Sequence, residues 1–285
     1  MRSLRVTRES EEKEQWQKKH ASKKKKRIIT NVSPVDKQLD LIGHQIVQGN
    51  YAEAITTCEH LLKYLPQHAQ QRADVLAQLG TAQGMLQNFP QSYDAFTQAL
   101  TLEPKNAELW YNRSMASRFT MRFGQAVRDI ERAIELNTRS ELTAQFNEAL
   151  QFSRQLAEKS IKLRGPGFTV DQLIEQENLF QQGLLLMESG KKEEAGQAFQ
   201  ASIAMGDCLP QPWGNLGICL MMQERYDEAE VALKRALEID PDYAIAKSNL
   251  VVLRTSRRTG PPVLVKLNEP FKSSNLNQSI TFIKE

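Results

Sequence analysis

The feature that most constrains this chain is a pattern of 34 residues that returns along it. In residues 210–243 a tryptophan, Trp213, stands at place 4 of the pattern, and a glycine, Gly217, stands at place 8. Alanines follow at places 20 and 27, and a proline follows at place 32. Because comparable residues return in four further segments, the pattern predicts a stack of equivalent structural units.

The five segments form two groups, with three before a break in the pattern and two after it. They are 35–68, 73–106, 107–140, 176–209 and 210–243. The signature residues are small at places 8, 20 and 27, aromatic at place 4 and proline at place 32. We take them to be structural, and they are Gly80, Ala99, Pro104, Trp110, Ala126, Ala133, Gly183, Ala195, Trp213, Gly217, Ala229, Ala236 and Pro241.

The spacing of these places has a direct physical meaning. Places 4, 7, 8 and 11 share one face of a first helix, and places 20, 24 and 27 share one face of a second. Small residues at places 8 and 20 let the two helices approach, and large apolar residues fill the space around them. Turn residues such as Gly49 and Gly190 separate the helices, and the proline ends the second. Each segment therefore predicts a helical hairpin.

The pattern resembles the tetratricopeptide repeat family, most specifically in 210–243, and the resemblance covers 35–140 and 176–258. It implies an all-α fold, an α-solenoid of stacked hairpins whose first helices line a concave groove. A last helix at 244–258 would cap the stack. Another kind of helical bundle remains the alternative.

Residues 141–175 break the pattern. Leu142, Phe146 and Leu150 begin a single apolar stripe that predicts one long connecting helix, which the Gly-Pro turn at 164–168 ends. Thr169, with a glutamine three residues later, then predicts the capped start of the next helix. Whether the two groups of repeats stack continuously or hinge here stays open.

The two ends of the chain differ from its middle. Residues 1–30 hold eleven Lys and Arg against four Glu, so we expect residues 1–32 to be a disordered basic tail. The first predicted helix follows, with Ser33 as its cap and Pro34 as its first residue. The C-terminal tail, 259–285, carries two short β-prone runs, at 263–267 and 279–283. A polyanion would contact the basic tail at Lys23, Lys24, Lys25, Lys26 and Arg27.

Composition and motifs exclude several classes of function. No apolar run is long enough to span a bilayer, and the basic N-terminus lacks the apolar core of a secretory signal. The three cysteines and four histidines fit no metal motif, so the thiols are interpreted as reduced, in the cytoplasm. Phosphate-binding, metalloprotease and nucleophile-elbow motifs are also missing, which predicts a non-enzymatic protein without a cofactor.

The groove that the resemblance implies would carry apolar, adaptable side chains and the asparagine common at place 6. Methionine-rich surfaces adapt to varied apolar partners. The alternative is that these side chains only pack between neighbouring helices. The candidate groove residues are Tyr111, Asn112, Met115, Phe180, Leu184, Asn215, Ile218, Met222 and Asn249. The Lys and Asn that a chaperone-binding carboxylate clamp needs at places 5 and 9 are missing from all five segments, which excludes that clamp.

Two functions follow from these patterns. The first is an adaptor or scaffold that binds an unknown protein partner, through a peptide or a helix, in the groove of the solenoid. The second is a nucleic-acid-associated factor whose basic tail contacts phosphates, with a salt-dependent affinity. In a eukaryote the run of lysines at 23–26 would also suit nuclear import.

Overall fold

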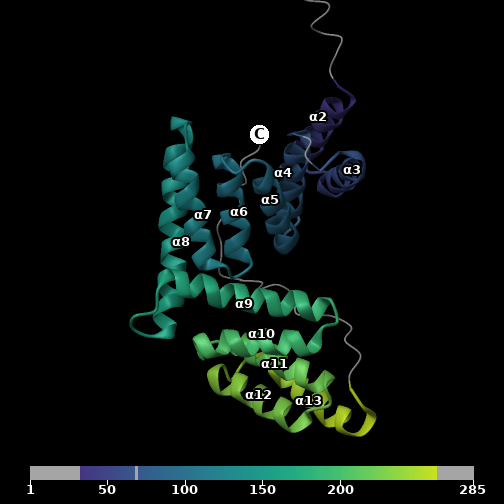
Figure 1. Cartoon of the computed structure of the whole chain (residues 1–285), viewed down its shortest axis with the longest axis vertical. Helices are drawn as coiled ribbons and strands as arrows, with labels where there is room; N and C mark the ends of the chain where they lie inside the picture. Colours follow the sequence, from purple (N-terminus) through teal and green to yellow (C-terminus); the bar gives the residue numbers. More distant parts are fainter. Residues whose placement is uncertain (1–32, 68–69, 262–285) are drawn as a thin grey trace, which may run out of the picture.

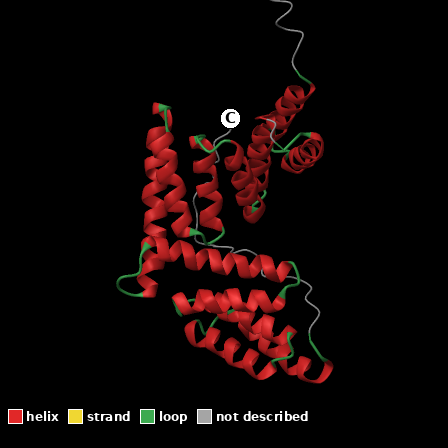
Figure 2. Ribbon diagram, in the orientation of Figure 1, coloured by secondary structure: helices red, strands yellow, loops and turns green. Residues whose placement is uncertain are grey.

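The computed structural model describes residues 33–67 and 70–261, which form helices and loops and no strand (Figure 2). The helices, shown in Figure 1, are α2 (Pro34–Val47), α3 (Tyr51–Tyr64), α4 (Gln70–Met85), α5 (Phe89–Leu102), α6 (Ala107–Phe119), α7 (Phe123–Leu136), the 3-10 helix η1 (Ser140–Leu142), α8 (Thr143–Arg164), α9 (Val170–Glu188), α10 (Lys192–Met205), α11 (Pro210–Met222), α12 (Tyr226–Ile239) and α13 (Ala244–Thr259). The all-α solenoid is confirmed for this part of the chain. The basic tail and the β-prone runs lie outside it.

Successive helices pair into hairpins because a small residue faces a large one. A Cβ atom added to the place-8 glycine would lie 2.9 Å from the ring of Phe96 in the hairpin of Gly80. In the hairpin of Gly183 it would lie 2.5 Å from the ring of Phe199. Phe96 and Phe199 stand at place 24 and are fully buried. The second helix of each hairpin therefore packs a ring into the space that the glycine leaves.

Places 8 and 24 share one volume in the remaining hairpins too. In the α6/α7 hairpin a serine, Ser114, stands at place 8, and the smaller Ile130 stands at place 24. The first hairpin reverses the sizes, with Ile42 at place 8 and Cys58 at place 24. All four side chains are fully buried. Close packing requires only that the two side chains together fill the gap.

This shared volume predicts a measurable coupling. Gly183→Ala places a methyl group against the ring of Phe199, so we expect it to cost roughly 1–3 kcal/mol of unfolding free energy. Adding Phe199→Leu frees part of that space, so the double variant should lose less than the sum of the two single variants. Urea unfolding of all four proteins measures the coupling. Costs that add to within about 0.5 kcal/mol would show that the two places do not share a volume.

The turn inside each hairpin carries a left-handed residue at place 15, the position of the two predicted turn glycines. These residues are Gly49 (φ 82°), Gln87 (φ 62°), Met121 (φ 59°), Gly190 (φ 74°) and Glu224 (φ 61°). Only glycine adopts this conformation without steric cost, so three of the five turns carry backbone strain at a residue other than glycine.

Both predicted helix starts are confirmed. The side chain of Ser33 accepts a hydrogen bond from the backbone N–H of Asp36, and the Asp36 carboxylate accepts one from Ser33. Thr169 and Gln172 form the same reciprocal cap at the start of α9. These caps satisfy N–H groups that a helix N-terminus otherwise leaves unpaired.

The helices form two blocks, α2–α8 and α9–α13, which do not stack continuously. Figure 1 shows α9 running crosswise below α6 and α7, with the lower end of α8 beside its start and α10–α13 beneath it. The expected long helix is present as α8, which packs on α7 and ends at Gly165 (φ 98°). Helix α9 begins at Val170, six residues before its repeat segment, and this added length contacts α7 and α8. The open question is thereby answered, because the solenoid turns at the α8–α9 loop.

Candidate functional site at the junction of the two blocks

The two blocks are joined by a carboxylate placed at a helix end. Helix α7 has no capping side chain of its own. Its first turn is satisfied by Glu177 of α9, whose carboxylate accepts the backbone N–H of Phe123 at 2.7 Å and that of Gly124 at 3.1 and 3.2 Å. The cap is thus supplied from more than fifty residues away. It binds the second block to the first.

The backbones of α7 and α9 also approach each other closely at this junction between the blocks. A Cβ at Gly124 would lie 2.7 Å from a side-chain carbon of Ile174 and 3.2 Å from the Ile174 nitrogen. Only a glycine lets α9 approach α7 this closely. The Gln181 amide also donates to the Thr120 carbonyl at 2.8 Å.

Burial at the joint changes the acidity of Glu177. Removal from water raises the pKa of this carboxyl group to about 8, although the N–H groups of Gly124 and Phe123 and the charge of Arg164 partly oppose the shift. In the unfolded chain a glutamate titrates near 4.3. The folded protein therefore keeps a proton on Glu177 over a pH range in which the unfolded chain has released it.

This difference sets the sign of a pH effect. Between about pH 4.5 and 8 unfolding releases the Glu177 proton, so raising the pH lowers the unfolding free energy. Glu177→Gln keeps an oxygen that accepts the α7 N–H groups and removes the titration. We expect the stability of the wild type relative to Glu177→Gln to fall across this window, as measured by urea unfolding at several pH values. A difference that stays constant or rises with pH would contradict the assignment.

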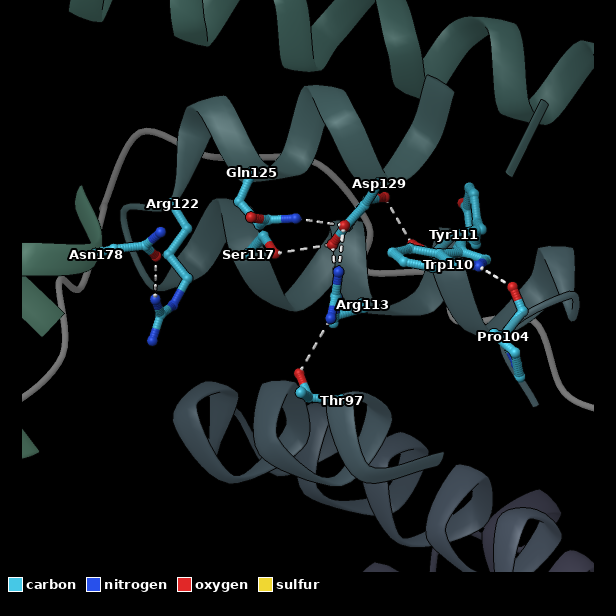
Figure 3. Close-up of polar contacts among 11 residues, drawn as sticks. Thr97, Pro104, Trp110, Tyr111, Arg113, Ser117, Arg122, Gln125, Asp129 and Asn178 are labelled. Carbon is cyan, nitrogen blue, oxygen red and sulfur yellow. Dashed lines mark hydrogen bonds and ion pairs between the residues drawn. The ribbon is translucent and has the colours of Figure 1, made fainter. Parts of the chain in front are cut away.

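A buried ion pair supports the first block beside the joint. Figure 3 shows Arg113 of α6 reaching Asp129 of α7, with Nε and Nη2 at 2.9 and 2.6 Å from the two carboxylate oxygens. Gln125 donates to the same carboxylate at 2.7 Å, and Nη1 of Arg113 reaches Thr97 of α5 at 3.4 Å. Burial opposes the charge on Arg113, yet the hydrogen bonds and charge of Asp129 prevail and raise the pKa of Arg113.

The same arginine and a second one, Arg122, both lie over one aromatic ring. The guanidinium carbon of Arg113 lies 5.5 Å from the centre of the Tyr93 ring, and that of Arg122 lies 4.2 Å from it. Arg122 also donates to Asn178 of α9 at 3.4 Å (Figure 3). These contacts link the buried pair, through Tyr93 and Arg122, to α9.

The ion pair predicts two opposite mutational results. Asp129→Ala leaves the buried Arg113 without its carboxylate and should cost about 3–5 kcal/mol. Arg113→Leu with Asp129→Ala reproduces the residues at the same places in the α11/α12 hairpin, Leu216 and Ala232, so it should be close to wild type in stability or above it. Urea unfolding distinguishes the variants. A double variant that unfolds as readily as Asp129→Ala would contradict this prediction, because it would show that the ion pair stabilises the fold beyond compensating its own two buried charges.

A cavity of about 450 Å³ lies where the blocks meet, and we call it the junction cavity. Its floor is a stripe along α9, its first wall is made by the α4/α5 and α6/α7 turns, and its second wall comes from the starts of α11 and α13. The lining residues are Gln87, Asn88, Pro90, Gln91, Tyr93, Asp94, Phe119, Thr120, Met121, Arg122, Phe180, Gln181, Leu184, Leu185, Glu188, Gln211, Tyr243 and Ile245.

Three polar atoms at this cavity are buried without a hydrogen-bond partner among the described residues. They are Oε1 of Gln211, the hydroxyl oxygen of Tyr243 and Nε of Arg122. Burial, with a contribution from Asp240, raises the pKa of Tyr243 to about 12, so its hydroxyl stays protonated. Each of these atoms has almost no solvent-accessible surface, so none of them faces the open volume of the cavity.

The predicted groove residues separate in the structure. Phe180 and Leu184 are half-buried and line the junction cavity. Met222 and Asn249 are half-buried outside it. Five others are buried between helices and present no open surface: Tyr111, Asn112, Met115, Asn215 and Ile218. The structure therefore brings only two of the nine candidate groove residues, Phe180 and Leu184, together at this cavity.

The signature residues lie in the contacts between helices. Gly217 resembles the other place-8 glycines, since a Cβ there would lie 2.7 Å from Leu233. The indole N–H groups of Trp110 and Trp213 donate to the loops before them. Pro104 and Pro241 are exposed. The signature alanines are fully buried, and they are Ala99, Ala126, Ala133, Ala195, Ala229 and Ala236. The predicted polyanion contacts, Lys23–Arg27, lie outside the described residues.

Sequence reasoning missed several charged residues of the interior. Arg113 occupies place 7, where Leu79 and Leu216 stand in other segments, so the departure from the pattern was a usable signal. Arg118 is buried against the Phe152 ring, and burial lowers its pKa to about 10. Nothing in the local sequence marks Glu177, because its partners lie in a different block.

Burial disfavours the thiolate form of all three cysteines. Burial raises the pKa of Cys58 and of Cys219 to about 12, so neither is a thiolate at neutral pH. Within the described residues no cluster of three His, Cys, Asp or Glu side chains is arranged to hold a metal ion. None of the described helices has the length and apolar character needed to cross a membrane.

Comparison with known proteins agrees with the class that this geometry defines, a solenoid of helical hairpins. Residues 210–243 match the family model of the tetratricopeptide repeat. This segment is a tetratricopeptide repeat, and the hairpins before it follow the same 34-residue pattern. A stretch of 87 residues is 34% identical to the peroxisomal targeting signal receptor of Yarrowia lipolytica, and it covers 30% of this chain but only 14% of that receptor.

Solved structures resemble the chain at a low level. The tetratricopeptide repeat domain of P58(IPK) gives a TM-score of 0.41 at 12% identity, over 78% of this chain and 65% of that one. The TPR2AB domain of yeast Sti1, in a complex with pHSP90, gives 0.36 at 12% identity, over 78% and 83% of the two chains. Likeness at this level carries no information about what this chain binds.

Proposed function

We propose that this protein is a non-enzymatic adaptor that binds a peptide segment of a protein partner along α9, in the junction cavity. The observation that carries the proposal is the stripe on α9, where Phe180, Leu184 and Leu185 lie between walls supplied by both blocks. Leu185 is 56% exposed, so a partner can reach its side chain from solvent.

The arrangement suits an extended peptide. The stripe runs from Phe180 to Glu188, which is about 12 Å along a helix. That length accommodates three or four residues of extended chain. Apolar side chains of the partner would pack against the floor, as anchor residues do in other interfaces. The alternative function is contact between Lys23–Arg27 and phosphate groups. It stays a prediction, because these residues lie outside the part of the chain that the structure describes.

Substitution at the exposed floor residue tests the proposal. Peptides are first selected on the wild-type chain from a random phage-displayed library, and their dissociation constants are measured. Leu185→Glu places a charge on the floor and should weaken these peptides about tenfold or more, with an unchanged melting temperature. Val231→Glu is the matched control, because Val231 of α12 is equally apolar, is 66% exposed and lies outside the cavity.

Two outcomes would contradict the proposal. One is a set of selected peptides whose affinity is the same for wild type and Leu185→Glu. The other is an equal loss of affinity in Val231→Glu, which would indicate general charge repulsion rather than a site on α9.

A further inference from the structure

The charges around the junction cavity are unequal. Asp94 of α5 and Glu188 of α9 place two carboxylates on its lining, against the single guanidinium of Arg122. Within the described part of the chain neither carboxylate forms a hydrogen bond or an ion pair. Arg122 is already engaged, since its guanidinium lies over the Tyr93 ring and donates to Asn178. The cavity therefore offers more negative than positive charge to an incoming group.

One of these carboxylates is in an unfavourable environment. Burial raises the pKa of Asp94, and the charge of Arg122 only partly opposes this. A second cation brought to the cavity would stabilise the ionised form of Asp94. The unpaired carboxylates are thus complementary to a positively charged ligand.

Side chains of Phe180, Leu184 and Ile245 add apolar surface to the lining of the cavity. The cavity therefore combines apolar surface with the two unpaired carboxylates.

We propose that the junction cavity recognises a basic peptide segment of a partner protein, in which a large apolar residue adjoins a lysine or an arginine. The apolar side chain packs on the α9 floor, and the cationic side chain lies near the carboxylates of Asp94 and Glu188. This inference rests on the proposed function and adds the chemistry of the partner to it.

Defined peptides test the charge preference. Fluorescein-labelled Gly-Gly-Phe-Lys-Gly-Gly, and the same peptide with Glu or Gln in place of Lys, are titrated with the full chain, and binding is followed by fluorescence anisotropy. We expect the Lys peptide to bind roughly five- to tenfold more tightly than the Gln peptide, and the Glu peptide to bind most weakly. The advantage of Lys should shrink as salt is added.

Variants assign the preference to the cavity. Asp94→Asn with Glu188→Gln should bring the Lys peptide to the affinity of the Gln peptide, and Asp94→Lys with Glu188→Lys should favour the Glu peptide. The matched control is Glu193→Gln with Glu194→Gln, which removes two exposed carboxylates of α10 outside the cavity and should change nothing. Melting temperatures establish that each variant is folded.

The outcomes separate this inference from the proposed function. Equal binding of the three peptides, or an equal effect of the control pair, overturns the charge preference. Library peptides that lose affinity in Leu185→Glu but carry no Lys or Arg leave the proposed function standing and overturn this inference alone. If the cavity variants instead change only the sedimentation mass of the chain, the cavity is an interface between two copies, and the inference is also overturned.

Discussion

The hydrogen bonds between the Glu177 carboxylate and the first turn of α7 determine how the two halves of this molecule meet. A helix N-terminus exposes N–H groups that need an acceptor, and α7 supplies none from its own side chains. Glu177 satisfies them from α9, and Gly124 permits the backbone approach that the bond requires. The cavity exists only because the blocks are held in this relation, since its walls come from both.

The repeated hairpins follow from sequence periodicity because each depends on contacts within about thirty residues. The local features are the small residues at places 8 and 20, the place-15 turn and the two capping boxes. Each of them can be predicted from the spacing of residues along the sequence. The left-handed turns were predictable at Gly49 and Gly190. At Gln87, Met121 and Glu224 the same conformation occurs without its usual residue, so glycine content alone does not reveal these turns.

The candidate site was less predictable for a physical reason. The candidate groove residues, chosen from the repeat register alone, included Ile218, whose side chain is buried between helices, and Met222, which lies outside the cavity. Register tells which face of a helix points inward, but it does not tell how closely the next hairpin covers that face. The turn between the blocks uncovers Phe180, Leu184 and Leu185, and that turn depends on contacts between residues some fifty positions apart.

The shared volume at places 8 and 24 bears on how such a chain can change by recombination. A whole hairpin carries both partners of the pair, so it can be duplicated, lost or exchanged with its internal fit intact. A single helix cannot, because a first helix with Ile42 joined to a second helix with Phe199 would overfill the gap, and Gly183 joined to Cys58 would leave it empty. The unit that can be inherited and exchanged independently is therefore the hairpin, and the crossover points compatible with folding lie between hairpins.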